Sequence, residues 1–103
     1  MGKSAKKKDF ELFDKIQGQV EGVYNELSVL SKKNPHDAVN EFKLTLVNEI
    51  LKQAIELLDD TRKPFSGFEQ FDLDSSPTNS DVTFILAQFF NCMEKMRMES
   101  IHY

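Results

Sequence analysis

Apolar residues in the first third of the chain recur alternately three and four positions apart. The positions are Phe13, Ile16, Val20, Val23, Leu27 and Leu30. This spacing is typical of a helix that lies against other helices along one face. Acidic residues stand near the start of the segment, and Lys32 and Lys33 stand at its end, which complements the helix dipole. The pattern predicts a helix over about residues 9–33.

A second helix is predicted from about residue 35 to residue 60. Asn34 is a suitable N-cap, Pro35 suits the first helical position, and Asp37 places a carboxylate in the first turn. Apolar residues then cover more than half of the helix circumference. They are Val39, Phe42, Leu46, Val47, Ile50, Leu51, Ala54, Ile55, Leu57 and Leu58. The narrow polar stripe that remains includes Asn48, so we expect this helix to pack on more than one side, at the centre of the fold.

A third helix is predicted over about residues 80–99. Thr78 and Asp81 fit a capping box, with Ser80 as a rival cap. The residues of its buried stripe are Val82, Ile85, Leu86, Phe89, Met93 and Met96. We find no internal repeat and no strand pattern of useful length. The short link after the first helix favours antiparallel neighbours, so the predicted fold is all-α, an up-down-up three-helix bundle.

Residues 61–79 are predicted to form a long aromatic-rich loop with neither helical nor strand spacing. The loop contains Phe65, Phe68 and Phe71. Connections longer than about 12–15 residues are uncommon and often functional or disordered. Disordered segments are poor in aromatic residues, so these rings are expected to dock. They either cap this domain's own core or face a partner's groove.

Two further features lie outside the predicted core. Gly18 and Gly22 project almost opposite the apolar face of the first helix, although each glycine in a helix interior costs about 1 kcal/mol relative to alanine. Either these glycines arose by mutational drift at exposed positions, or they allow another backbone to approach the helix closely. Phe84 and Met98 point away from the buried stripe of the third helix. Exposed together, they would form an apolar patch of the kind that marks a protein contact.

Charge is distributed unevenly along the chain of 103 residues. Four lysines give residues 1–8 a charge of +4, and residues 9–103 then carry nine Lys or Arg against seventeen Asp or Glu, or −8. We therefore expect a flexible basic tail over residues 1–8 and a single helical domain over residues 9–103. An acidic body is a poor match for nucleic acid, so no nucleic acid partner is expected. No apolar stretch approaches the ~20 residues of a membrane span, and the lysine-rich start has no secretory pattern. With a single cysteine, this indicates a cytoplasmic protein with no membrane association.

Catalytic and metal-binding residues are sparse. The two histidines are His36, in the predicted first turn of the second helix, and His102, the penultimate residue. Cys92 lies on the flank of an apolar stripe, where cysteines are mostly inert. No H-E-x-x-H, paired C-x-x-C or glycine-rich phosphate loop is present. We therefore expect no metal, no cofactor and no catalytic residue.

One catalytic pattern supports an alternative. Arg97 and His102 are separated by four residues, which resembles the R-x(4–6)-H element of HEPN-domain ribonucleases. That family is all-helical and of similar size, and the resemblance implies that both residues act on an RNA phosphodiester in a dimer cleft. The match covers six residues, and Met98 stands where the family usually has a polar residue.

The leading hypothesis is a small soluble helical module that binds protein and self-associates as a homodimer. Its predicted partner-binding residues are Phe65, Phe68, Phe71, Phe84, Gly18 and Gly22. One alternative is the ribonuclease described above. The other is a carrier of a small apolar ligand, in a pocket lined by phenylalanines and by Met93, Met96 and Met98.

Overall fold

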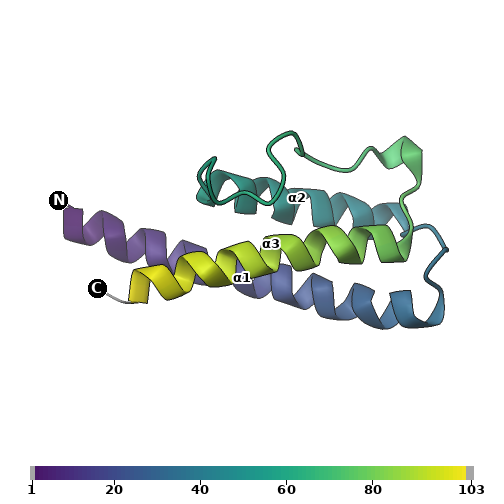
Figure 1. The fold of residues 1–103 in the computed structure, drawn as a ribbon, viewed down its shortest axis with the longest axis horizontal. Helices are drawn as coiled ribbons and strands as arrows, with labels where there is room; N and C mark the ends of the chain where they lie inside the picture. The colour runs from purple at the N-terminus through teal and green to yellow at the C-terminus, as the bar shows by residue number, and fades with distance from the viewer. Residues whose placement is uncertain (1, 102–103) are drawn as a thin grey trace.

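Three α-helices make up most of the chain in the computed structural model, which describes the backbone of residues 2–101 and the side chains of residues 10–99 (Figure 1). They are α1 (Gly2–Lys33), α2 (Glu41–Leu57) and α3 (Asn79–Ile101). A short 3-10 helix, η1 (Leu73–Ser75), interrupts the connection between α2 and α3. No strand is present within the described backbone, apart from a single bridge between Ala38 and Thr78. The predicted all-α three-helix fold is confirmed.

The predicted up-down-up order of the helices is wrong. The guanidinium of Arg97 lies 2.6 Å from the Asp14 carboxylate, so the end of α3 lies beside the early part of α1. The N–H of Val39 donates to the Pro77 carbonyl at 2.9 Å, which places the starts of α2 and α3 together. Thus α1 is antiparallel to both other helices, while α2 and α3 are parallel (Figure 1).

The connection between α2 and α3 explains this direction. A helix of 17 residues is about 25 Å long, and an extended chain advances about 3.3 Å per residue. The connection is therefore long enough to return along the whole of α2, and Figure 1 shows it doing so before η1. A short link would force α3 to start at the end of α2, but this one allows it to start where α2 starts.

The predicted start of α2 is also wrong. Asn40, not Asn34, is the N-cap, and its Oδ1 accepts the N–H of Lys43 at 3.2 Å. The preceding segment instead pairs with the start of α3, where the N–H of Asn79 donates to the Asp37 carbonyl at 2.8 Å. The side-chain amide of Asn79 also donates to the Asn34 carbonyl at 2.9 Å. These hydrogen bonds link the end of α1, the segment before α2 and the start of α3. They keep residues 34–40 out of α2.

The other helix ends agree with the prediction to different extents. α1 begins at Gly2 rather than near residue 9, because residues 2–8 contain four lysines and Ala5, which favour helix. α2 ends at Leu57, since the Asp59 carboxylate then accepts the N–H groups of Thr61 and Arg62 in a turn. At the start of α3, the Thr78 hydroxyl accepts the N–H of Asp81 at 3.2 Å, as predicted. The flexibility of residues 1–8 stays a prediction.

The core is built around α1. Its face of alternating spacing is buried against residues from both other helices. The buried core residues include Phe13, Ile16, Val20 and Leu27 of α1, Leu44, Val47, Leu51 and Ala54 of α2, and Val82, Leu86, Phe89 and Met93 of α3. α2 and α3 contact each other much less than each contacts α1. The expectation that α2 is central is wrong, and its Phe42 side chain is 72% exposed.

Asn48 fastens the connection to α2. Its side-chain amide donates to the Phe71 carbonyl at 3.0 Å and its Oδ1 accepts the Phe71 N–H at 2.8 Å. Asn48 is only 9% exposed, so it is not part of a solvated polar stripe. These two hydrogen bonds give partners to the Phe71 N–H and carbonyl, which are not part of a helix or strand. It thereby holds the loop against the bundle.

We expect Asn48→Ala to lower the free energy of unfolding by about 1–3 kcal/mol, because it leaves the Phe71 N–H and carbonyl without their partner. Urea unfolding followed by circular dichroism measures this change. Glu49→Ala, at the exposed neighbouring position, is the control and should change stability by less than about 0.5 kcal/mol. Equal effects of the two substitutions would contradict the anchoring role.

Candidate functional site

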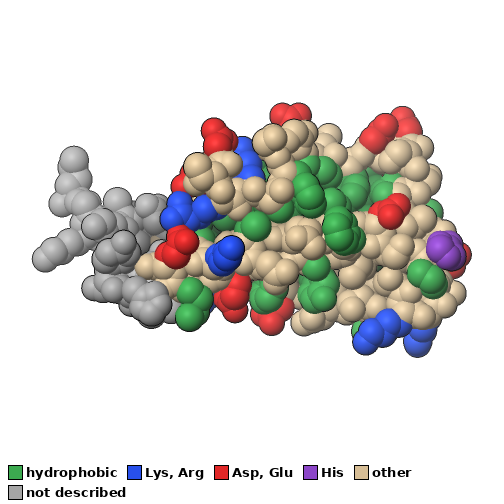
Figure 2. All heavy atoms as spheres, in the orientation of Figure 1, with side chains coloured by type: hydrophobic (Ala, Val, Ile, Leu, Met, Phe, Trp, Pro, Cys, Tyr) green, Lys and Arg blue, Asp and Glu red, His purple; other side chains and the backbone are tan. Residues whose placement is uncertain are grey.

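An aromatic pair lies at the surface where the connection meets α3. Phe84 of α3 is 57% exposed, and the partly buried ring of Phe65 lies against it with centroids 6.4 Å apart. We call these two side chains the aromatic surface. Figure 2 shows apolar side chains gathered between the connection and α3 on the face it presents. The structure thus brings together two of the four predicted phenylalanines in an accessible position.

The other two predicted phenylalanines support the connection from within. The ring of Phe68 packs edge-on against Phe71 at 5.1 Å between centroids. Phe68 also lies 5.9 Å from Phe89, which is fully buried in the core. Both loop rings are therefore partly buried against the core. Their packing gives the connection a fixed shape.

Gly18 and Gly22 lie on α1, outside the aromatic surface. Both are exposed, and a Cβ added to either would have no other group within 4 Å. Val29, on the same side of the helix, is 54% exposed. The helix backbone is therefore accessible along this face, and room for a close neighbour is present.

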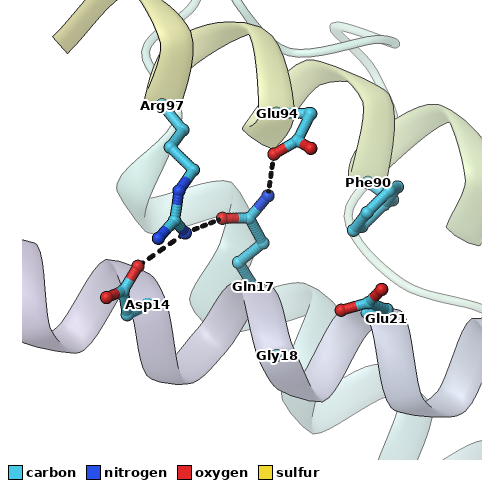
Figure 3. Close-up of a pocket in the computed structure, with 7 residues that line it drawn as sticks. All are labelled: Asp14, Gln17, Gly18, Glu21, Phe90, Glu94 and Arg97. Atoms are coloured by element: carbon cyan, nitrogen blue, oxygen red, sulfur yellow. Dashed lines mark hydrogen bonds and ion pairs between the residues drawn. The ribbon is translucent and has the colours of Figure 1, made fainter. Parts of the chain in front are cut away.

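A polar groove of about 490 Å³ lies between α1 and α3. Its lining residues are Asp14, Gln17, Gly18 and Glu21 of α1 and Phe90, Glu94 and Arg97 of α3 (Figure 3). Gln17 is 5% exposed, and it donates to Glu94 Oε1 and accepts from Arg97, each at 2.8 Å. The Arg97 guanidinium also pairs with Asp14. The sequence analysis missed Gln17. Its position beside the buried apolar face of α1 is one where polar contacts between packed helices occur.

The chemistry of this groove is that of a structural polar network. Three carboxylates face one guanidinium, so the net charge is negative and does not favour a phosphate group. Arg97 already donates to Asp14 and Gln17. His102 lies outside the described residues, so its pairing with Arg97 is not tested.

Other reactive side chains are dispersed. Burial raises the pKa of the Cys92 thiol, which nearby Lys95 opposes only in part. The Thr61 hydroxyl and then the Arg62 guanidinium lower the pKa of the Asp59 carboxyl. Arg62 also donates to Glu99 at 3.0 Å and so ties the connection to α3. Among the side chains of residues 10–99, no three His, Cys, Asp or Glu are grouped to hold a metal ion.

The predicted methionine-lined pocket has no counterpart in the groove. Met93 is fully buried in the core and Met96 is partly buried against it, whereas Met98 is 52% exposed. Two of the three methionines therefore serve core packing. The apolar-carrier hypothesis itself stays untested.

The Gln17 network should show energetic coupling across α1 and α3. In a double-mutant cycle of Gln17→Ala and Arg97→Ala, we expect a coupling energy of about 0.5–3 kcal/mol, because each residue satisfies the other in a partly buried site. Urea unfolding of the four proteins measures it. The control cycle combines Gln17→Ala with Lys95→Ala, at an exposed position of α3, and should give no coupling energy. A coupling near zero in the first cycle would contradict the network.

We expect the Cys92 thiol to react slowly with a thiol reagent at pH 8, because burial raises its pKa and the thiolate is the reactive form. The rate should rise as the pH increases beyond the usual thiol range. A control places the thiol at the exposed neighbouring position, as Asn91→Cys in a Cys92→Ser background, and should react faster. Equal rates in folded and urea-unfolded wild-type protein would refute the protection.

Comparison with known proteins gives no relative, since no family model, curated protein or solved structure matches the chain. No helix in the described part of the chain is both long enough and apolar enough to cross a membrane. The function must therefore be inferred from the surfaces themselves.

Proposed function

We propose that this chain is a small helical module that binds protein, a second copy of itself included, and that the aromatic surface of Phe65 and Phe84 contacts a protein partner. The observation that carries the proposal is the 57% exposure of Phe84 on a rigid helix, backed by a second ring. Aromatic residues, phenylalanine among them, are enriched in protein interfaces relative to the rest of the surface.

The energetic reason is the burial of apolar area without a large loss of freedom. A phenylalanine can bury about 150–250 Å², and each Å² of apolar area removed from water contributes about 25 cal/mol. Phe84 is fixed to α3, and Phe65 is held in a connection fastened by Phe68 and Asn48. Little side-chain entropy is then lost on binding, so more of the burial contributes to affinity.

Charge contributes to the choice of partner. Residues 9–103 carry a net charge of −8, so a partner with basic residues around an apolar contact is favoured over an acidic one. The proposal places this contact in a reducing compartment such as the cytoplasm, where the single cysteine stays a thiol.

Phe84→Asp should abolish partner binding and leave the melting temperature within about 2 °C of wild type, because an exposed ring contributes little to the core. Affinity capture from the native lysate compares the proteins retained by wild type and variant. Asn91→Asp adds the same charge at an exposed position of α3 and should retain the wild-type set. If Phe84→Asp retains that set as well, the aromatic surface is not the contact.

Phe68→Asp provides the structural contrast. It places a carboxylate against the fully buried Phe89, so the free energy of unfolding should fall by more than about 3 kcal/mol. Thermal unfolding of the two variants side by side separates the surface ring from the packed ring. A Phe68→Asp protein as stable as wild type would show that this ring also faces outward.

A further inference from the structure

The middle of the connection between α2 and α3, residues 64–74, is held to the helices by few bonds. We call this segment the strap. None of its residues is buried, and seven of the eleven are exposed. No backbone group of the strap bonds to the backbone of an α-helix, within the part of the chain that the structure describes. Segments with exposed side chains and few backbone hydrogen bonds are those that open before the rest of a protein unfolds.

Asn48 of α2 is the polar attachment of the strap. Its side chain makes two hydrogen bonds to the Phe71 backbone, at 3.0 and 2.8 Å. Among the described residues, these are the hydrogen bonds that join the strap to an α-helix, and no ion pair does so. Asn48 is 9% exposed, so its bonds lie in a site that is largely shielded from water, where they are stronger.

Two hollows separate the strap from α2 near this attachment. One, of about 430 Å³, lies beside Asn48 and extends from Thr45 of α2 to Asp74 of the strap. The other, of about 380 Å³, lies further along α2, between Glu56 and Glu69. Each is large enough for water molecules. The strap is therefore not packed continuously against α2, and it can leave this helix without repacking it.

Both ends of the connection are held independently of Asn48. Near its start, the Arg62 guanidinium donates to Glu99 Oε1 of α3 at 3.0 Å and also pairs with Asp59. Near its end, the N–H of Val39 donates to the Pro77 carbonyl at 2.9 Å. A segment that is fixed at both ends, with one polar attachment between them, can swing away while its ends stay in place.

A line of contacts leads from Asn48 to the aromatic surface. Asn48 bonds to Phe71, whose ring packs edge-on against Phe68 at 5.1 Å between centroids. The Phe68 N–H donates to the Phe65 carbonyl at 3.4 Å, and the Phe65 ring lies against Phe84. The position of Phe65 over Phe84 therefore depends on the strap being in place.

The three helices can stay folded while the strap is open. Fully buried residues such as Ile16 of α1, Leu51 of α2 and Leu86 of α3 belong to the core around α1, which contacts both other helices extensively. The strap reaches this core through Phe68, which lies 5.9 Å from Phe89, and through Phe71. Opening thus uncovers one edge of the core and leaves its centre intact.

We propose that the strap opens from the helices as one unit, that Asn48 is its latch, and that the aromatic surface is complete only while the strap is closed. The last part rests on the proposed function, because it is the partner contact that opening interrupts. A partner that touches both Phe65 and Phe84 binds the closed form and shifts the population toward it. Asn48 is then a positioning residue for this contact, although it lies outside the aromatic surface.

Saturation-transfer NMR of the full chain measures the open form. In Asn48→Ala, we expect the amides of the strap to share one exchange process, with the ratio of open to closed form at least about tenfold above wild type, because two buried hydrogen bonds are lost. The ring signals of Phe65 and Phe84 should show the same rate and population, while α1 amides show no exchange. Glu49→Ala, at an exposed position lining the same hollow, is the control and should match wild type.

Hydrogen exchange in the wild-type protein tests the opening without any substitution. The Phe71 N–H should exchange at least about 100-fold faster than that of Leu51, after correction for intrinsic rates, because a local opening suffices to expose it. Low concentrations of urea should hardly change the Phe71 rate, since little surface is exposed, but should raise the Leu51 rate. The same urea dependence at both residues would show that the strap opens only on global unfolding, and would overturn the proposal.

The remaining outcomes separate this proposal from the proposed function. Exchange confined to Phe71 in Asn48→Ala, or strap exchange without matching exchange at the Phe84 ring, overturns the proposal even where Phe84→Asp abolishes partner capture. Matching exchange at the strap and the Phe84 ring supports it. If Phe84→Asp then still captures the wild-type set of proteins, the strap and its latch stand while the proposed partner contact fails.

Discussion

The hydrogen bonds between the Asn48 side chain and the Phe71 backbone hold the connection between α2 and α3 against α2. The connection after α2 contributes only a single 3-10 turn of regular structure, so its backbone groups need partners from elsewhere. Asn48 supplies a donor and an acceptor at one place. Once the connection is held along α2, its aromatic rings reach the core and α3 can start beside the start of α2. Asn48 thus supports the parallel direction of α2 and α3, together with the backbone bonds from Val39 to Pro77 and from Asn79 to Asp37 that join the starts of the two helices.

The sequence predicts well those parts of the fold that local spacing controls. The buried apolar face of α1 and the Thr78 cap of α3 both lie where the sequence pattern predicts them. Residues close together in the chain are enough to determine each of them. The start of α2 and the order of the helices are different, since they depend on bonds such as that from Asn79 to Asp37, between residues far apart in the chain. Asn34 followed by proline is a valid cap locally, but the tertiary bonds require a turn there instead.

The candidate surfaces show the same division. Spacing alone indicates that Phe84 lies off the buried stripe of α3, and the structure leaves it exposed. Spacing cannot show which of Phe65 and Phe68 is at the surface, because the loop is aperiodic. The structure places Phe65 against the exposed Phe84 and Phe68 against the buried Phe89. The apolar breadth of α2 is also evident in the sequence. Which side of that helix remains uncovered depends on where the connection runs, and no local pattern specifies that path.

The path of the connection also explains why this small fold retains two separate apolar surfaces. By running along one side of α2, the connection uses Phe68 and Phe71 to fill the space between α2 and α3, which contact each other little. The opposite side of α2, with Phe42 and Leu46, receives no such cover. Contiguous exposed apolar side chains are a site of protein contact or of aggregation. The path of the connection thus decides which apolar side chains of α2 stay exposed.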